Sequence, residues 1–468
     1  MGEVRHNCGF CVTHSLHDAY NFTKSLQHRG REAVGIAAIA DNRIDVLKWA
    51  GTVDRFDLET LHYIFHGTYH SFMGHVRYAT RGKKDRILED AHPIAIGGKA
   101  EKRKNHVIIR ECELAIVHNG QIDDKYFEGV ELSNLKTGTD TEKVLRFYRE
   151  RGEIEIIKKI PGAYSMAIAD LRKKEIMVLR DSRGLRPGVL GWGWKDGKYA
   201  VASEPVALQQ NEAEISEDLD LGSIYYLSSD GTYRKLRVVE PRPKHCFFEY
   251  NYISHFSSTL NELEVRRVRI KLGEKLADEF PLKADFVTYM PRCPMPAARS
   301  YAEKRGIPFF PVFYKPRAER AFLGSTTEER KESINENLWL LPGIKEKIKG
   351  KKGICIDDST IRGNNLRRAR ELMYADGEVQ SVVLLNYTPK IGIIGSDGAE
   401  RGCLFGVDMP PNDNFIARNR SDEQISEEMG IDVRFLSLEG MLETYKELGM
   451  PPDNLCTFCV GGKHPFEA

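Results

Sequence analysis

The sequence predicts a protein of two domains, in which a first half built mainly from short strands precedes a second half of alternating strands and helices. A chain of 468 residues is longer than one hydrophobic core usually organises, so two or three domains are expected. Residues 105–232 alternate short strands with turns, and one helix is expected near 140–151. From residue 241 onward, apolar strands alternate with helical segments, which predicts a parallel sheet.

Composition narrows the function classes. The 69 basic and 68 acidic residues give a formal net charge of +1, so no global field favours nucleic acid or a membrane surface. The N-terminus has no apolar signal region, and no apolar run is long enough to span a bilayer. We therefore expect a soluble, cytoplasmic protein. Nine cysteines are too sparse for a disulfide scaffold and are better explained as a nucleophile, metal ligands or core residues.

The first segment carries Cys8 and Cys11. Residues 21–39 follow, and their pattern predicts a helix that closes near Gly30 and then a buried strand. Taken alone, Cys8 is either an inert small apolar residue or a nucleophile. Cys11 is expected in the core.

Five short motifs decide how Cys8 is interpreted. In chain order they are Cys8 with Gly9, QHRGREAVGI at 27–36, GHVRYAT at 74–80, HNG at 118–120 and GTDTE at 138–142. The set resembles the N-terminal nucleophile glutaminase domain of class II glutamine amidotransferases. Residues 161–169, 180–187 and 202–204 extend the resemblance as strands and turns. The implied fold is an α+β four-layer N-terminal nucleophile hydrolase domain with two central antiparallel sheets over residues 8–240, and a proline-containing boundary at 241–244.

The resemblance implies how glutamine would be hydrolysed. The Cys8 thiol would attack the side-chain amide of glutamine, with the α-amino group of Cys8 as the base, because such an amine titrates at about pH 8. This role requires Cys8 to become the first residue, so residues 1–7 are expected to be a propeptide. Asn119 and the backbone amide of Gly120 would stabilise the oxyanion.

Two further residues would bind the substrate's charged groups. Arg77 would pair with the α-carboxylate, and Asp140 would hold the α-ammonium group. Each assignment has a structural alternative. Arg77 could be a strand-end ion pair, Asp140 a helix N-cap, and the Asn119–Gly120 pair a tight hairpin turn.

The second half begins with an expected charged helix at about 260–279. A buried strand at 284–291, a helix at 297–306 and a third strand at 308–315 follow. A further buried strand, 353–356, leads directly into two adjacent acids, Asp357 and Asp358.

The loop after this strand has the residues for a sugar phosphate. It continues through Ser359, Arg362 and Gly363 into a helix at 366–373. In an open α/β sheet the ligand crevice lies at the carboxyl ends of the strands, and amides at a helix start can bind phosphate. The two acids could take ribose hydroxyls or a magnesium ion, while Ser359 and the amides around Gly363 take the phosphate. A solvated acidic loop is the alternative.

This string resembles the phosphoribosyl diphosphate loop of type I phosphoribosyltransferases. The implied second domain is an α/β parallel-sheet phosphoribosyltransferase domain over residues 241–468. In this order, the two domains resemble the amidophosphoribosyltransferase family. That resemblance implies that glutamine and phosphoribosyl diphosphate give phosphoribosylamine, the first step of de novo purine synthesis. Ammonia would pass through an internal channel, and Mg²⁺, held by Asp357 and Asp358, would neutralise the leaving diphosphate. A homotetramer or homodimer is implied as well.

Four cysteines suggest a separate metal site. Cys456 and Cys459 form a CxxC, which suits zinc, a redox pair or an iron–sulfur cluster. Together with Cys246 and Cys403 they resemble the ligands of a [4Fe-4S] cluster found in a subset of the family, and zinc is the alternative. The other cysteines, expected as core or loop residues, are Cys112, Cys293 and Cys355.

The second domain departs from its family's pattern at three places. PRCP at 291–294 stands where the family usually has PDSG, the following loop is shortened to 315–323, and Asn364 and Asn365 replace two hydroxyl residues. Arg292 could pair directly with an anion. Two other functions therefore stay open: a class II glutamine amidotransferase with another phosphorylated acceptor, and a non-catalytic nucleotide-binding paralogue. The complete set of glutaminase residues favours an enzyme.

Overall fold

The computed structural model describes residues 8–78, 86–315 and 338–467. The chain divides into two compact units. Unit 1 comprises the residues up to Cys246 together with Phe405–Asp408, and unit 2 comprises Phe247–Leu404 and Met409–Glu467. The predicted boundary at residue 240 lies near this division, whereas the predicted propeptide, residues 1–7, lies outside the described residues.

Unit 1 is built on a sheet of 13 strands in which all neighbours run antiparallel. The order is β11-β9-β10-β1-β4-β2-β3-β6-β7-β8-β12-β13, with β5 beside β6. The strands are β1 (Gly9–Thr13), β2 (Ala33–Ala40), β3 (Arg43–Ala50), β4 (Ser71–Arg77), β5 (Ile94–Lys102), β6 (His106–Gln121), β7 (Ala163–Asp170), β8 (Glu175–Arg180), β9 (Val189–Gly193), β10 (Tyr199–Ala202), β11 (Ala213–Asp218), β12 (Ser223–Ser228) and β13 (Tyr233–Arg237).

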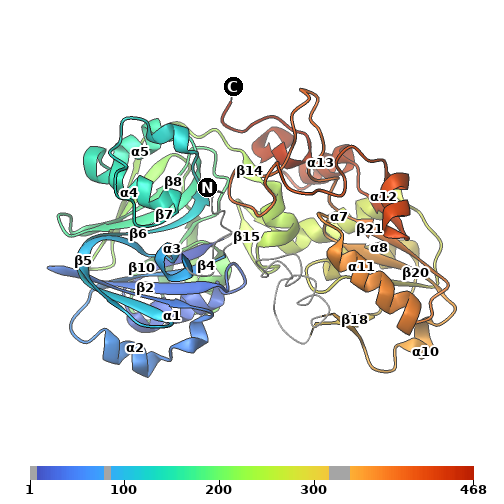
Figure 1. Ribbon diagram of the computed structural model, residues 1–468, viewed down its shortest axis with the longest axis horizontal. Coiled ribbons are helices and arrows are strands. Elements are labelled where there is room, and N and C mark those ends of the chain that lie inside the picture. Colours follow the sequence, from blue (N-terminus) through green and yellow to red (C-terminus); the bar gives the residue numbers. More distant parts are fainter. Residues whose placement is uncertain (1–7, 79–85, 316–337, 468) are drawn as a thin grey trace. The chain divides into compact units, whose positions relative to one another are not determined.

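The long strand β6 joins the two halves of this sheet. Its first part pairs with β3, and its last part, from Leu114 to Gln121, pairs with β7. Apolar side chains of β1 and β2, such as Phe10 and Ala37, share one core with Ala167 and Val178 of β7 and β8. The two halves therefore pack face to face as central layers (Figure 1).

Helices cover both outer faces of these layers. The helices of unit 1 are α1 (Leu16–Ser25), α2 (Leu58–Ile64), α3 (Ile87–Asp90), α4 (Asp140–Arg151), α5 (Glu153–Lys159) and α6 (Pro205–Gln209). One core cluster joins α1, α2 and α6 to the first half of the sheet, and another joins α4 and α5 to the second half. The predicted four-layer α+β fold is thus confirmed.

Local signals account for the helix positions in unit 1. Helix α4 spans the predicted residues and ends at Gly152, which adopts a φ of 81°. Helix α1 begins before the predicted start at residue 21, because Ser15 caps it by accepting a hydrogen bond from the Asp18 amide at 3.0 Å.

Unit 2 contains a parallel four-stranded sheet in the order β17-β20-β21-β22, as the strand and helix alternation predicted. These strands are β17 (Phe286–Tyr289), β20 (Lys352–Asp357), β21 (Ser381–Asn386) and β22 (Asp432–Phe435). The helices are α7 (Val265–Glu279), α8 (Met295–Arg305), α10 (Lys345–Ile348), α11 (Asn364–Glu371), α12 (Asp422–Met429) and α13 (Leu438–Glu447). A buried core that includes Phe286, Cys355 and Leu384 holds the sheet to its helices.

The predicted third strand, 308–315, is wrong in extent. Phe309 forms only an isolated parallel bridge with Val287, and β18 (Phe313–Tyr314) pairs antiparallel with β19 (Trp339–Leu340). Pro308 and Pro311 have no backbone N–H to donate, so this segment cannot form a continuous ladder. Of the shortened loop predicted at 315–323, only Lys315 lies within the described residues.

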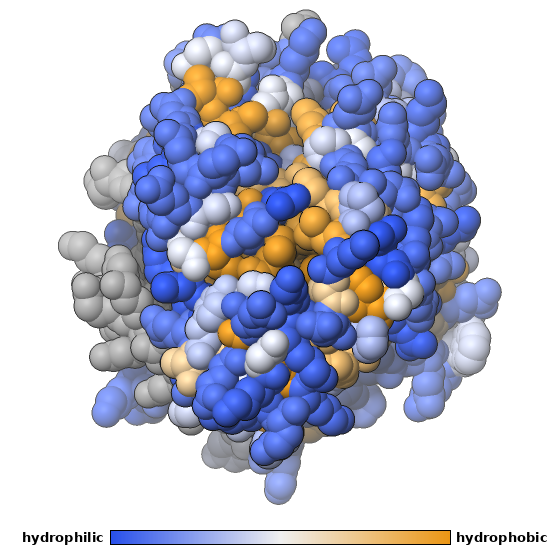
Figure 2. Space-filling model, turned by 90° about the vertical axis from the view of Figure 1, so that its right-hand side faces the viewer, coloured by the Kyte–Doolittle hydropathy of each residue, from blue (hydrophilic) through white to orange (hydrophobic). Residues whose placement is uncertain are grey.

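The surface view in Figure 2 is mostly hydrophilic, with apolar side chains gathered in a hollow near its centre. The large apolar side chains most exposed in the described part of unit 2 are Phe256, Trp339, Met295 and Tyr314. None of the helices in the described ranges is long and apolar enough to cross a membrane.

Candidate active sites

Strand pairing brings Cys8 beside Arg77. Cys8 directly precedes β1, and β1 runs antiparallel to β4 with Gly9 opposite Val76. Continuing this register by one residue sets Cys8 opposite Arg77, the last residue of β4. The side chain of Cys8 is fully buried, and Nε of Arg29 donates to its carbonyl oxygen at 2.8 Å.

The environment of the Cys8 thiol keeps it neutral at pH 7. Burial raises the pKa of Cys8 to about 11, opposed by a backbone hydrogen bond from Tyr78 and by the charges of Arg77, Arg186 and Arg29. Since only the thiolate is a strong nucleophile, attack by Cys8 needs a base that removes this proton.

Arg77 is buried between two carboxylates but retains unused donors. Its Nη1 donates to Oε2 of Glu32 at 3.2 Å, and its Nη2 lies 3.6 Å from Oδ2 of Asp90. The strand-end ion pair considered from the sequence therefore exists. Nε and Nη2 of Arg77 make no hydrogen bond within the described part of the chain. These two neighbouring donors match the two oxygens of a carboxylate.

Asn119 and Gly120 lie inside β6, where they face Ser165 and Tyr164 of β7. The hairpin-turn alternative is therefore wrong, because the strand continues through both residues to Gln121. A Cβ at Gly120 would lie 1.9 Å from the carbonyl oxygen of Ala163, so only glycine fits this close approach.

The side chain of Asn119 is poised for a ligand. It is completely buried, and within the described residues neither its Oδ1 nor its Nδ2 makes a hydrogen bond. An unsatisfied buried amide costs about 1–3 kcal/mol, and a bound ligand that supplies a partner removes this cost. The position next to Gly120 suits a pair of donors for an oxyanion.

Asp140 is the first residue of α4, and its N-cap is Thr139. The N-cap alternative for Asp140 is therefore wrong. Its Oδ2 accepts a hydrogen bond of 2.8 Å from the amide of Ile122, which follows β6. This contact connects the start of α4 to the strand that carries Asn119 and Gly120.

Three buried histidines, for which the sequence predicted no role, form a cluster with Thr141. Oγ1 of Thr141 lies 2.9 Å from Nε2 of His92 and 3.0 Å from Nδ1 of His118. His75 stacks on His92 at 4.3 Å between ring centroids, and its Nε2 lies 3.1 Å from the carbonyl oxygen of His118. Burial lowers the pKa of His75 and of His118 to about 3, so both are neutral. The motifs at 74–80, 118–120 and 138–142 contained three of these four residues.

In unit 2, the predicted acidic pair lies at the carboxyl edge of the parallel sheet. Asp357 ends β20 and pairs with Asn386 at the end of β21. Tyr289, the last residue of β17, pairs with Ile356, the residue before Asp357. Asp358 follows, and its backbone amide donates to Oδ1 of Asp357 at 2.9 Å. This edge is where open α/β sheets bind ligands.

The acidic edge disfavours two free negative charges. Burial, and then the charge of Asp358, raise the pKa of Asp357 well above its usual range. Burial also lowers the pKa of Lys315, while Asp357 and Asp358 act to raise it. A bound cation or a ligand that donates hydrogen bonds would relieve this repulsion.

The residues after the acidic pair have different partners. Oγ of Ser359 donates to Oδ2 of Asp358 at 2.7 Å. Gly363 is the N-cap of α11 with a φ of 75°. The guanidinium of Arg362 is held by Asp413 through two hydrogen bonds, one of them 3.1 Å from Nε to Oδ1. No sequence pattern pointed to Asp413, which lies 51 residues further along the chain.

The side chains of the described residues fit one of the two predicted metal sites better than the other. No group of three or more His, Cys, Asp or Glu residues within 8–78, 86–315 and 338–467 is arranged to hold a metal ion. The pair Asp357 and Asp358 fits Mg²⁺ of the kind that takes one or two carboxylates and completes its shell with water and substrate phosphates.

The four cysteines predicted as cluster ligands divide between the units. Cys246 ends the first stretch of unit 1, and Cys403, Cys456 and Cys459 are buried in unit 2. The carbonyl of Cys459 accepts from the Gly392 amide at 2.9 Å, and the next residue, Ile393, accepts from the Arg401 amide at 2.9 Å. The segments that contain Cys403 and Cys459 therefore both hydrogen-bond to residues 392–393. The three unit 2 thiols do not by themselves form a metal site, and the cluster stays a prediction.

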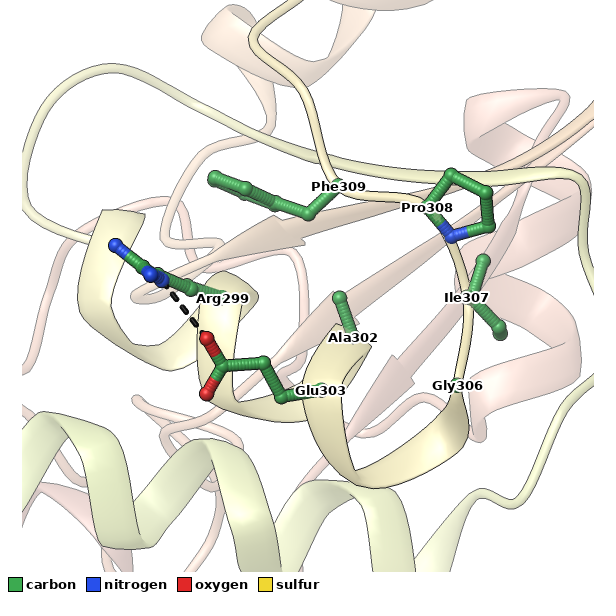
Figure 3. Close-up of a pocket in the computed structure, with 7 residues that line it drawn as sticks. All are labelled: Arg299, Ala302, Glu303, Gly306, Ile307, Pro308 and Phe309. Atoms are coloured by element: carbon green, nitrogen blue, oxygen red, sulfur yellow. Dashed lines mark hydrogen bonds and ion pairs between the residues drawn. The ribbon is translucent and has the colours of Figure 1, made fainter.

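A hollow of about 450 Å³ lies where α8 ends, lined by Ala302 and by residues 306–309. Figure 3 shows Arg299 and Glu303 at its rim, joined by a hydrogen bond of 2.8 Å. None of its lining residues belongs to the acidic edge, so this hollow plays no part in the sites described above.

Comparisons with known proteins agree on both halves of the chain. A family model described as a glutamine amidotransferase domain matches residues 96–210. An amidophosphoribosyltransferase from Methanothermobacter thermautotrophicus is 30% identical over 99% of this chain and 95% of its own length. The protein of the same name from Bacillus subtilis is 28% identical over 95% of this chain and 90% of its own.

Solved structures extend the likeness to the fold. The glutamine phosphoribosylpyrophosphate amidotransferase from Bacillus subtilis, complexed with ADP and GMP, has a TM-score of 0.79 and 26% identity, and the match covers 98% of this chain and 97% of that one. A structure described as the allosteric regulatory enzyme of purine biosynthesis gives the same TM-score and identity over 98% of this chain and 96% of that one.

Proposed function

Because this chain belongs to the amidophosphoribosyltransferase family, we propose that it releases ammonia from glutamine at Cys8 and uses that ammonia to make phosphoribosylamine at the acidic edge of unit 2. This is the first step of de novo purine synthesis. The observation that supports the glutaminase assignment is that two buried side chains, Arg77 opposite Cys8 in the strand register and Asn119 in β6, have open polar groups that match the charged and reacting parts of glutamine.

Glutamine hydrolysis starts with the transfer of the Cys8 thiol proton to the α-amino group of the same residue. The thiolate attacks the amide carbon, and the resulting oxyanion accepts hydrogen bonds from Asn119 Nδ2 and the Gly120 amide. The intermediate collapses as the amino group returns the proton to the leaving nitrogen, which releases ammonia. Water then hydrolyses the thioester to glutamate and regenerates the thiol.

Substrate is held at both ends. Nε and Nη2 of Arg77 bind the α-carboxylate, and the carboxylate of Asp140 binds the α-ammonium group. Use of the Cys8 α-amino group requires that residues 1–7 be removed.

In unit 2, Asp357 and Asp358 bind the ribose hydroxyls, while Ser359 and the amides that follow Gly363 bind the phosphate. Mg²⁺ held by Asp357 and Asp358 would neutralise the diphosphate. The ammonia nitrogen attacks carbon 1 of the ribose, the bond to the diphosphate oxygen breaks, and the nitrogen loses a proton. Lys315 contributes a positive charge near both acids.

The function is tested by separating the two half-reactions. In Cys8→Ala, glutamine-dependent product formation should disappear, while phosphoribosylamine should still form from phosphoribosyl diphosphate, Mg²⁺ and added ammonium. Cys112→Ala, a buried cysteine in β6, is the control and should retain both activities. Loss of the ammonia-dependent reaction in every variant and in the wild type would instead indicate another phosphorylated acceptor.

The cysteines predicted as metal ligands support a second proposal. We propose that Cys246, Cys403, Cys456 and Cys459 bind a [4Fe-4S] cluster. The CxxC motif supports this, as do the hydrogen bonds that join the segments of Cys403 and Cys459 to residues 392–393. Protein purified without oxygen should contain iron and acid-labile sulfide in equal amounts, and Cys459→Ser should lose both. Stoichiometric zinc without sulfide, or no metal at all, would contradict this assignment.

A further inference from the structure

Asp90 lies between the two ends of the proposed glutamine site. It is the last residue of α3, and only 3% of its surface is exposed. Its Oδ1 accepts a hydrogen bond of 2.9 Å from the amide of Gly138, and its Oδ2 lies 3.6 Å from Nη2 of Arg77. One carboxylate therefore contacts both the residue assigned to the α-carboxylate and the loop that leads to Asp140.

The loop before Asp140 is held by side-chain acceptors at three successive amides. The amides of Lys136 and Thr137 donate to Glu142 Oε2 at 2.9 and 2.7 Å, and the amide of Gly138 donates to Asp90. Glu142 belongs to α4 itself, so it fixes the loop only relative to its own helix. Asp90 connects this loop to a different part of unit 1, together with Arg86, whose Nη2 donates to the carbonyl oxygen of Lys136 at 3.3 Å.

Asp90 also balances the charge around Arg77. The guanidinium faces Glu32 and Asp90, but the Asp90 side chain is only 4% exposed and that of Glu32 is 23% exposed. Charges in the less exposed pair are screened less by water. Lys48 is a second buried cation here. Burial and then the charge of Arg77 lower its pKa to about 8, while Asp90 acts in the opposite direction.

We infer that Asp90 is a positioning residue for glutamine, which aligns Arg77 with the loop that carries Asp140 so that both ends of the substrate are bound at once. The inference rests on the proposed glutaminase function. Asp90 holds Arg77 by charge at 3.6 Å and leaves Nε and Nη2 open for the substrate. Without this charge, Glu32 is the one carboxylate left beside Arg77 among the described residues, and the guanidinium would turn toward it.

Two reagents separate positioning from reactivity. 6-Diazo-5-oxo-L-norleucine carries the α-carboxylate and α-ammonium groups of glutamine and alkylates a glutaminase nucleophile, whereas iodoacetamide alkylates the same thiol without either group. The test measures the rate of modification of Cys8 by each reagent, read by peptide mass in the two-unit protein from which residues 1–7 have been removed. The variants are Asp90→Asn, which keeps an acceptor for Gly138 but loses the charge, and Asp90→Ala, which loses both.

The neighbouring residue supplies a matched control. Glu89→Gln removes a carboxylate from the same helix, but this side chain is 40% exposed and contacts Arg86 and Lys102 at the surface. With each lost contact worth about tenfold, Asp90→Asn should slow the diazo reagent about tenfold and Asp90→Ala about a hundredfold. Iodoacetamide should modify Cys8 at the wild-type rate in all variants. The KM for glutamine should rise in the same order, with kcat changed far less.

Several results would overturn the inference. Equal rates with the diazo reagent in wild type and Asp90→Asn would show that Asp90 does not position the substrate. Equal slowing with both reagents would show that Asp90 only maintains the fold. If Asp90→Ala does not fold, Asp90→Asn alone decides between these outcomes. Wild-type protein whose Cys8 never reacts with the diazo reagent would refute the glutaminase function, and the inference with it.

Discussion

Oγ1 of Thr141 lies 3.0 Å from Nδ1 of His118, and this contact joins the start of helix α4 to the end of strand β6. Both residues are sequence neighbours of proposed active-site residues: Thr141 follows Asp140, and His118 precedes Asn119. The residue that would hold the ammonium group and the residue that would stabilise the oxyanion are thereby fixed relative to each other.

Replacement of Thr141 by valine should weaken both stability and glutamine hydrolysis. The change keeps the shape but leaves Nδ1 of the buried His118 without its partner, which costs roughly 1–3 kcal/mol in the free energy of unfolding. Urea unfolding measures this loss, and the glutaminase kcat should fall with it. Thr232→Val, at an exposed turn, is the control and should change stability by about 0.5 kcal/mol or less. Wild-type values for Thr141→Val would contradict the account.

Asn119→Ala should separate activity from stability. Loss of an oxyanion donor typically lowers kcat by about 10²–10³-fold. Because the Asn119 side chain makes no hydrogen bond in the described structure, its removal should change the free energy of unfolding by about 1 kcal/mol or less. Glutaminase assays and urea unfolding on the same preparation test this. A large loss of stability with normal kcat would show that Asn119 is a structural residue.

Stability should fall as the pH decreases from about 6.5 toward 4. Burial lowers the pKa of His75 and His118 to about 3 and that of His245 to about 4, so these rings bind protons in the unfolded chain before they do so in the folded one. Proton uptake by the unfolded state favours unfolding. Asp181 opposes this, because burial raises its pKa to about 6 and the folded state binds its proton first. Asp357, whose pKa burial also raises, acts in the same direction as Asp181. The three histidines outnumber these two acids.

Urea unfolding at pH 7.5, 6 and 5 tests the balance between these groups. The account predicts a steady decrease in the free energy of unfolding across the series. A value that is constant or rises toward pH 5 would show that the histidines are not held neutral in the folded protein.

Asp358→Asn should affect only the reaction of unit 2. The change removes a charge that would bind ribose hydroxyls or Mg²⁺, and a hydrogen bond to a charged group is worth about 1.5–3 kcal/mol, or roughly 10–100-fold in the KM for phosphoribosyl diphosphate. Hydrolysis of glutamine alone should continue. Asp376→Asn, at an exposed position of the same unit, is the control. An unchanged KM for phosphoribosyl diphosphate in Asp358→Asn would place its binding elsewhere.

Local pattern was sufficient to predict the elements that carry the proposed chemistry. The apolar run before Asp357 predicted β20, and the helix predicted at 140–151 coincides with α4. Both predictions depend on neighbouring residues alone. The run at 308–315 was misjudged because two prolines interrupt its hydrogen bonding, although its apolar pattern resembles that of a strand.

Contacts between distant segments could not be predicted in this way. Asp90 meets Gly138 across 48 residues, and Arg362 meets Asp413 across 51. The pairing of Cys8 with Arg77 follows from the register between β1 and β4. The sequence motifs placed these two residues in one site only through their resemblance to a known family. The tertiary fold decides which polar residues meet, and a single sequence contains little information on such pairs.

In the proposed function, one chain couples glutamine hydrolysis to the amination of phosphoribosyl diphosphate. The most direct measurement follows glutamate and phosphoribosylamine together in one anaerobic reaction with glutamine, phosphoribosyl diphosphate and Mg²⁺, and determines the mature N-terminus by mass. The account predicts equal amounts of the two products from a protein that begins at Cys8. Glutamate without phosphoribosylamine would contradict the assigned acceptor, and activity in protein that retains residues 1–7 would contradict the role of the Cys8 amino group.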